Sequence, residues 1–95
     1  MTLRNRKITL RGKRWELAFV PFISEGSFGE CDDPCRVGKQ IRIAENQSES
    51  EMLDTVLHEA LHACLPDLAE HAVAETSESL SSLLKSLGIK GIKKG

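Results

Sequence analysis

Hydrophobic and polar residues alternate along much of the first half of the chain, which is typical of strands with one buried face. Residues 8–10 form a short alternating segment, residues 12–13 supply a turn, and residues 14–20 form a longer alternating segment. The apolar positions that share a face of the longer segment are Trp15, Leu17 and Phe19. Two antiparallel strands joined by a tight turn are therefore predicted here.

A third alternating segment covers residues 39–44, in which Ile41 and Ile43 are expected to face the core. Pro21 cannot donate a hydrogen bond to a sheet, and residues 24–38 are rich in Gly, Ser, Asp and Pro. We therefore expect a long surface loop before the third strand. The first half should fold as a three-stranded antiparallel sheet.

After residue 48 the apolar residues change to spacings of three and four, which is typical of a helix with one face on the core. Ser48 with Glu51 three residues later forms a capping box, so the first helix should begin there and run to about Cys64. Its apolar face consists of Leu53, Val56, Leu57, Ala60, Leu61 and Cys64.

Pro66 ends this helix, because the residue before a proline is disfavoured in helical geometry. A second helix is expected from Asp67 to Gly88, with the glycine as its C-cap. Its inward stripe is expected to be Glu70, Val73, Ser77, Leu80, Leu84 and Leu87.

Strands followed by helices indicate the α+β class, as a small antiparallel three-stranded sheet followed by two packed helices. Residues 1–95 are few enough to form a single domain. The basic ends, at about residues 1–6 and 89–95, are expected to be flexible.

The first predicted helix carries the pattern His-Glu-x-x-His, formed by His58, Glu59 and His62. Residues four apart lie one turn above each other on a helix, so both imidazoles can bind the same metal ion. In zinc peptidases with this spacing, zinc lowers the pKa of a bound water to roughly 7 and the glutamate accepts its proton. The pattern predicts His58 and His62 as zinc ligands and Glu59 as the general base.

Catalytic zinc usually has a third protein ligand. Glu70 lies on the inward stripe, in the first turn of the second predicted helix, so we predict that it completes the site. His71, about 100 degrees around the helix from Glu70, is an alternative ligand or a stabiliser of the transition state. Glu70 also has capping-box spacing with Asp67, so the alternative role for its carboxylate is to bind a backbone amide.

Charge is unevenly distributed along the chain, although the formal net charge is only −1. Residues 1–14 contain six Lys and Arg and no acid, whereas residues 45–78 contain nine carboxylates and no Lys or Arg. Four more lysines lie near the C-terminus, at Lys85, Lys90, Lys93 and Lys94. Basic ends can bind nucleic acid, so a nucleic-acid-associated accessory protein is one alternative function.

Three cysteines, Cys31, Cys35 and Cys64, are an odd number, which argues against a secreted disulfide framework. The charged start lacks the apolar region of a signal peptide, and no apolar run is long enough to span a membrane. We therefore expect a cytoplasmic protein without a membrane partner.

Several segments of the chain resemble small phage-encoded zinc metallopeptidases. They are Gly29-Glu30-Cys31-Asp32 with Pro34, Ile41-Arg42-Ile43, the run from His58 to Cys64, and Glu70-His71-Ala72-Val73. These are minimal gluzincin-type proteins, similar in style to the SprT-like group, and the similarity covers roughly residues 14–88. Relatives have Glu-Glu-Ala-Val at the start of the second helix, where this chain has Glu70 followed by His71.

The resemblance implies a minimal zincin-like fold with one Zn²⁺ per chain, bound by His58, His62 and a glutamate of the second helix. It also implies Glu59 as the base, a peptide or protein substrate, and the host cytoplasm as the location. No particular substrate follows from it.

The predicted function is that of a zinc-dependent metallopeptidase, a hydrolase in which Glu59 deprotonates a zinc-activated water and then protonates the leaving amine. Because the chain contains no tyrosine, His71 or an arginine such as Arg42 is the candidate protein group for stabilising the oxyanion. An extended substrate is expected to add along a strand edge beside the first helix, near residues 41–43, and the sequence does not show which edge is free. A non-catalytic zinc-binding interaction domain would keep the same ligands and is the second alternative function.

Overall fold

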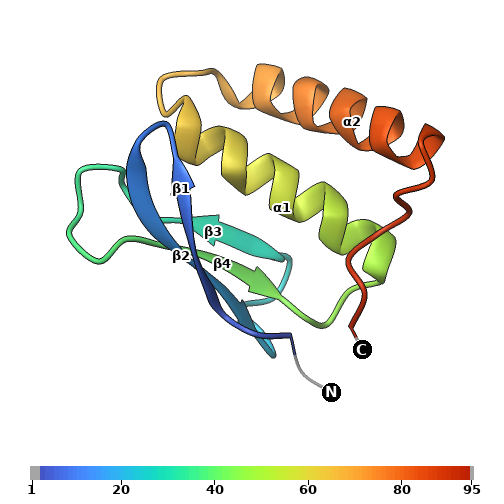
Figure 1. Ribbon diagram of the computed structural model, residues 1–95, viewed down its shortest axis with the longest axis horizontal. Helices are drawn as coiled ribbons and strands as arrows, with labels where there is room; N and C mark the ends of the chain where they lie inside the picture. The colour runs from blue at the N-terminus through green and yellow to red at the C-terminus, as the bar shows by residue number, and fades with distance from the viewer. Residues whose placement is uncertain (1–2, 95) are drawn as a thin grey trace.

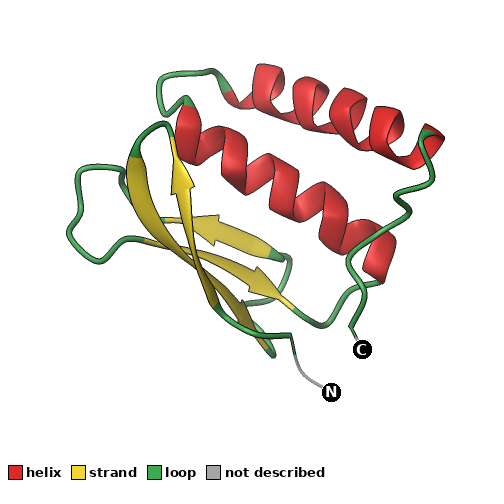
Figure 2. Ribbon diagram, viewed as in Figure 1, coloured by secondary structure: helices red, strands yellow, loops and turns green. Residues whose placement is uncertain are grey.

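The computed structural model describes residues 3–94, which form a four-stranded sheet and two helices (Figure 1). The strands are β1 (Arg6–Leu10), β2 (Lys13–Val20), β3 (Gly29–Cys31) and β4 (Gln40–Ala44), and the helices are α1 (Glu49–Cys64) and α2 (Glu70–Ser86). Helix α1 lies between the sheet and α2, so the elements form three layers (Figure 2). Neither helix is long and apolar enough to cross a membrane.

The strand order in the sheet is β1-β2-β4-β3. β1 pairs with β2 and β3 pairs with β4 in the antiparallel direction, whereas β2 and β4 are parallel. The α+β class and the two packed helices are confirmed, but the prediction of three antiparallel strands was wrong. The loop predicted at residues 24–38 contains β3, and β4 is inserted between β2 and β3, which makes its pairing with β2 parallel.

The core lies between the sheet and α1. The side chains of Trp15, Ile41, Ile43 and Met52 are almost completely buried there, and Leu17 and Phe19 pack against them. The inward position predicted for the two isoleucines is therefore confirmed, and α1 rests on a wall of apolar side chains from β2 and β4.

Helix α1 begins at the predicted capping box. The Ser48 side chain accepts a hydrogen bond from the backbone N–H of Glu51, and the Glu51 carboxylate accepts one from the backbone N–H of Ser48, both at 3.1 Å. At the other end Arg11, in the β1–β2 turn, donates to the backbone carbonyl of Cys64 at 2.8 Å. Both ends of the helix that carries the His-Glu-x-x-His pattern are therefore fixed.

Helix α2 begins at Glu70 rather than at Asp67, and its N-cap residue Ala69 makes no side-chain capping bond. Its buried face consists of Val73, Ser77 and Ser81, whereas Leu80 and Leu87 are 38% and 70% exposed. The prediction that these two leucines face inward was wrong. Small side chains face α1 instead, and the Lys85 ammonium and the Ser81 hydroxyl both donate to the Asp54 carboxylate of α1.

The chain after α2 turns back across the start of α1 (Figure 1). Ile92 donates its backbone N–H to the carbonyl of Glu49 at 2.9 Å, and the backbone N–H of Lys94 donates to the Glu49 carboxylate at 2.8 Å. Gly91 lies so close to α1 that a Cβ atom there would be 2.5 Å from the Glu49 carbonyl carbon. These residues fall within the end that the composition predicts to be flexible.

We expect Gly91→Ala to lower the free energy of unfolding by about 1–3 kcal/mol, because the added methyl forces the tail away from α1. Urea unfolding followed by circular dichroism measures the change. Lys90→Ala, at an exposed neighbouring position, is the control and should change stability by less than about 0.5 kcal/mol. Equal stability of the Gly91 and Lys90 variants would show that the tail does not depend on this contact.

Candidate metal centre and active-site cleft

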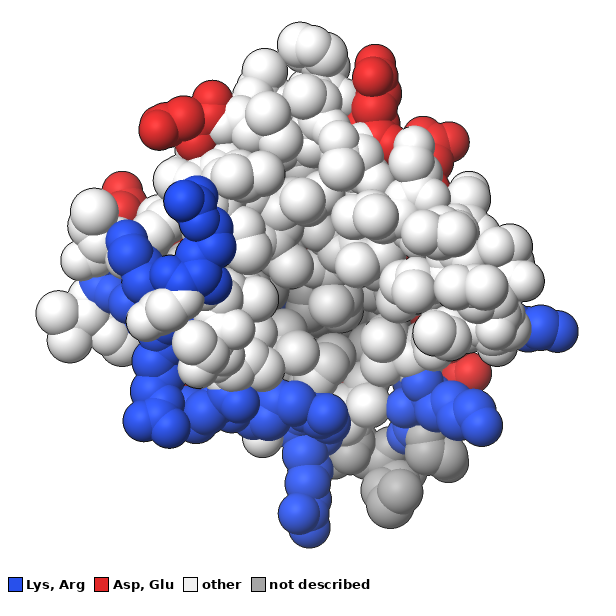
Figure 3. All heavy atoms as spheres, turned by 45° about the horizontal axis from the view of Figure 1, so that its top comes forward, with Lys and Arg blue, Asp and Glu red and all other residues white. Residues whose placement is uncertain are grey.

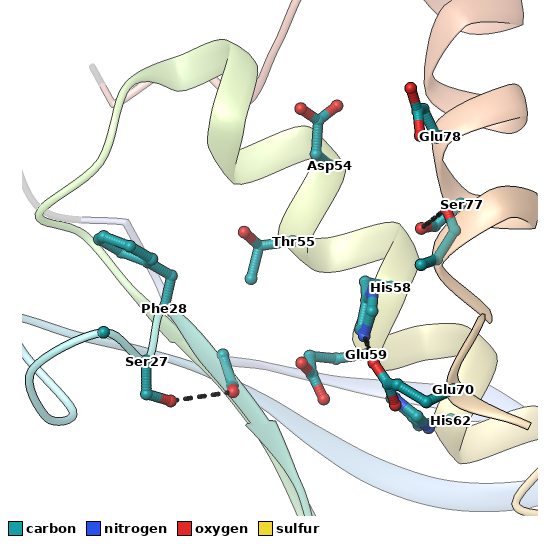
Figure 4. Close-up of a pocket in the computed structure, with 13 residues that line it drawn as sticks. Ser27, Phe28, Asp54, Thr55, His58, Glu59, His62, Glu70, Ser77 and Glu78 are labelled. Carbon is teal, nitrogen blue, oxygen red and sulfur yellow. Dashed lines mark hydrogen bonds and ion pairs between the residues drawn. The ribbon is translucent and has the colours of Figure 1, made fainter.

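A cleft of about 650 Å³ lies where α1, the start of α2 and the segment leading into β3 meet (Figure 4). Its walls are formed by Gly26, Ser27, Phe28, Gly29, Asp54, Thr55, His58, Glu59, His62, Glu70, Ala74, Ser77 and Glu78. All four residues predicted for the zinc ligands and the base line it. The loop and strand residues that close it were not predicted as site residues.

The two histidines and Glu70 converge at one point of this cleft. The Glu70 carboxylate lies 2.9 Å from His58 Nε2 through one oxygen and 2.9 Å from His62 Nε2 through the other. The two Nε2 atoms are 3.2 Å apart. Helix periodicity places both histidines on the side of α1 that faces α2, and Glu70 reaches them from the first turn of α2 (Figure 4).

This donor set fits zinc. One ligand atom from each of the three residues lies within 4.8 Å of the others, and no second group of this kind occurs among residues 3–94. Tetrahedral zinc with bonds of about 2.0–2.1 Å places its ligand atoms about 3.3 Å apart, close to the three separations found here. The two histidine side chains are each 27% exposed, so a bound ion would keep access to solvent.

Glu59 lies on a different side of α1, facing β3 (Figure 4). Only 9% of this residue is exposed, and burial raises the pKa of its carboxyl above the ordinary value, with His62 opposing the shift and Glu70 and Glu30 adding to it. No side-chain hydrogen bond to its carboxylate is formed within the described part of the chain. The carboxylate oxygens keep contact with the solvent of the cavities, since the only fully buried side-chain N or O atom without a partner among the described residues is Trp15 Nε1. A largely buried carboxylate with a raised pKa is typical of a functional group.

Gly29 makes this burial possible. A Cβ atom at this position would be 2.6 Å from the Thr55 methyl group and 2.9 Å from Glu59 Cγ. Only a glycine lets β3 approach α1 so closely that the strand covers Glu59. A glycine at the start of a short strand was the sequence signal for this contact, but β3 itself was not predicted.

A second cavity of about 360 Å³ lies on the other side of Glu59 and His62. It is lined by Cys31, Asp32, Asp33, Pro34, Glu59, His62 and Pro66. Burial, together with the nearby carboxylate of Glu59, raises the pKa of the Cys31 thiol to about 12, so this thiol stays protonated at neutral pH. Cys31 is not among the residues whose ligand atoms converge, which are His58, His62 and Glu70.

The structure does not bring His71 and Arg42 to the cleft. His71 is exposed on α2 and does not line either cavity. Arg42 is bound by Glu30 at 2.8 Å and by Asp32 at 2.7 Å, and its strand partners place it on the sheet surface away from Ile41 and Ile43. Neither side chain is placed to stabilise an oxyanion at the convergence of His58, His62 and Glu70.

Charge is segregated on the surface as well as in the sequence. Figure 3 shows basic side chains mainly along one side of the molecule, while the carboxylates visible in this view lie mainly toward the opposite side. Among the described residues that line the two cavities there is no Lys or Arg, but there are six Asp and Glu. The cleft therefore has a negative wall that favours cations.

Comparisons of this chain with protein-family models, with curated proteins and with solved structures find no significant match. Its function must therefore be inferred from the residues and the geometry of the site.

In the metal-free protein we expect Glu59→Gln to stabilise the fold at pH 7, because it removes a buried charge. The raised pKa of Glu59 means that its ionisation destabilises the native state increasingly as the pH rises above the ordinary value of 4.5. The gain should be a few degrees in Tm, since 1 kcal/mol corresponds to about 4–8 °C in a domain of this size. It should vanish below the ordinary pKa, where the wild-type side chain is also neutral.

Thermal unfolding in the presence of a chelator, at pH 7 and at pH 4, measures this difference. Glu78→Gln changes an exposed carboxylate of the same cleft and should have little effect at either pH. A Glu59→Gln protein that is less stable than the wild type at pH 7 would contradict the expected cost of this charge.

We also expect one zinc per chain in the wild-type protein, lost in Glu70→Ala and retained in His71→Ala, because only Glu70 contacts both ligand histidines. Metal analysis after gel filtration measures the content. The two neighbouring helix positions serve as controls for each other. Loss of zinc in the His71 variant alone would identify His71, and not Glu70, as the third ligand.

Proposed function

We propose that this protein is a zinc-dependent peptidase. The observation that supports this best is the single carboxylate of Glu70 bridging His58 and His62 at 2.9 Å on each side, in a cleft that also holds the buried Glu59. Three protein ligands beside an open cleft are typical of catalytic zinc, whereas structural zinc usually has four protein ligands. This number of candidate ligands supports a catalytic site over a structural one.

When bound, zinc supplies Lewis-acid chemistry, by which it polarises a carbonyl, stabilises the developing oxyanion and lowers the pKa of water. Glu59 then takes the proton of the attacking water on its carboxylate and delivers it to the nitrogen of the leaving amine. Burial against β3 suits this role, because it raises the proton affinity of the carboxylate toward that of an effective general base at neutral pH. His58 and His62 act only as ligands.

The sheet has an edge next to α1 with which we propose that an extended substrate pairs. The prediction that it adds near residues 41–43 was wrong, because β4 is covered on both sides by β2 and β3. The edge next to α1 is β3, which packs over Glu59 through Gly29. The backbone N–H of Ala44 donates to the Phe28 carbonyl, and the backbone N–H of Asp32 donates to the Gln40 carbonyl. Alternate residues of β3 therefore direct their backbone groups toward β4, and those between them, Gly29 and Cys31, direct theirs to the open side.

The main alternative is a non-catalytic zinc domain that binds a partner. Such a domain would need the three ligands but would have no use for a largely buried Glu59, whose raised pKa makes its ionised form costly to folding. A change at Glu59 therefore separates the two functions.

We expect zinc-loaded wild-type protein to hydrolyse unstructured peptides, and Glu59→Gln to lower kcat at least about 10²–10⁴-fold while zinc content stays at one per chain. Mass spectrometry of the peptide products measures turnover, and metal analysis of the same samples measures zinc. Glu78→Gln is the control, because it removes a carboxylate of the same cleft that does not contact the histidines. Zinc-loaded Glu59→Gln that is as active as the wild type would contradict the proposal.

A further inference from the structure

Two cavities border Glu59 and His62, and the two together are called the passage. The larger cavity, between α1, α2 and the start of β3, and the smaller cavity, between β3, its following loop and Pro66, share two lining residues, Glu59 and His62. These are the base and one ligand of the proposed site. The reacting position therefore lies within a passage, with space for substrate on both sides.

The open edge of β3 runs beside this whole passage, and its Gly29 carbonyl accepts a hydrogen bond from the Ser27 hydroxyl at 3.4 Å. Gly29 lines the larger cavity and Cys31 lines the smaller one. These residues are two apart on the strand, a distance of about 6.6–6.8 Å, and both turn their backbone groups to the open side. An extended chain paired with this edge is held by backbone hydrogen bonds before and after the bond that lies at Glu59.

The described walls of the passage provide no cation for a terminal carboxylate, and their unpaired carboxylates are not gathered at one end. An enzyme that trims a C-terminus needs a cation for the terminal carboxylate, and no Lys or Arg lines the described walls of either cavity. Two of the carboxylates are already paired, Asp32 with Arg42 at 2.7 Å and Asp54 with Lys85 at 3.0 Å. Glu78 lines the larger cavity and Asp33 the smaller one, so the unpaired carboxylates are divided between the two sides instead of forming one amine site.

We infer that this protein is an endopeptidase, which cleaves bonds within extended or unfolded polypeptide segments and does not require a free terminus. This inference rests on the proposed peptidase function. In the reaction the oxygen of water bonds to the peptide carbonyl carbon and the C–N bond breaks. One proton of the water goes through Glu59 to the leaving nitrogen, and no other reactant is needed.

The test compares unstructured peptides of the same sequences in three forms: blocked at both ends by acetyl and amide groups, free only at the N-terminus, and free only at the C-terminus. We expect zinc-loaded protein to cut all three at the same internal bonds with similar kcat/KM. Stepwise loss of single residues from the free forms, with the doubly blocked form intact, would overturn the endopeptidase inference and leave the peptidase function standing. No cleavage of any form would overturn both.

Binding gives a readout that does not depend on turnover. Titration of isotope-labelled Glu59→Gln with a doubly blocked peptide should shift backbone amide signals of both cavities, including those of Ala74 and Asp33. Shifts confined to one cavity would contradict a substrate that occupies both.

Narrowing each half of the passage tests the same point by kinetics. Ala74→Trp obstructs the larger cavity and Asp33→Trp the smaller one, and we expect each to raise KM for the doubly blocked peptide about tenfold or more. Asp33→Asn is the control for the loop, because asparagine keeps the side-chain oxygen that accepts a hydrogen bond from the backbone N–H of Cys35. A rise in KM in the tryptophan variant but not in this one is then due to the size of the tryptophan side chain or to loss of that hydrogen bond. Ser79→Trp, at an exposed position of α2 outside the cleft, should leave KM unchanged. An effect of only one of the two obstructing variants would indicate an enzyme that holds a chain end.

Discussion

The packing of α1 on two sides, against the sheet and against α2, determines where every group of the site lies. A helix turns about 100 degrees per residue, so neighbours in the motif face different layers. His58 and His62 face α2 and meet Glu70, whereas Glu59 faces β3 and is covered by it. If α1 were packed on one side only, either the third ligand or the covering strand would be missing. Fixing both helix ends, by the Ser48 capping box and by Arg11, maintains this orientation.

Helix α1 and the convergence of its two histidines could be predicted from the sequence because they depend on local signals. The capping box marks the first turn, and the histidines follow from their separation by one turn. The buried face was predicted less well, because the buried residues of α1 are Met52, Leu53, Glu59 and Ala63, and only Leu53 belongs to the predicted apolar face. The position of Glu70 was predicted from the stripe of α2, although that stripe was assigned incorrectly further along. Leu80 and Leu87 are exposed and Ser81 faces α1, because the Asp54 carboxylate binds Ser81 and Lys85 there. Periodicity alone cannot anticipate such a polar contact between helices.

The sheet was predicted less well, because its topology depends on pairing between distant segments. β3 is only three residues long, begins with a glycine and lies in a region rich in turn residues, so no alternation marks it. It exists as a strand because β4 supplies its hydrogen bonds and because Gly29 lets it rest on Thr55 and Glu59. The parallel pairing of β2 with β4 follows from β3, since the chain must cross the sheet and return before β4 begins. The part missed in the sequence is therefore the part that covers the proposed base.

The electrostatics of the site connect metal binding with folding. In the metal-free state Glu59 is buried without a partner, and the nearby carboxylate of Glu70 raises its pKa further. A dication at the proposed centre would offset both carboxylates and join α1 to α2 at the end where the turn at residues 65–69 connects them. The opposite end of the helix pair is already held by Asp54 with Lys85. The metal centre and the Asp54–Lys85 ion pair lie at different ends of the interface between α1 and α2. The metal would therefore join two helices that the ion pair already holds together at the other end. Preorganisation of this kind lets a small domain place three ligands and a base without a second lobe. The packing of the helices orders these side chains, so metal binding does not have to supply all the free energy that their ordering requires.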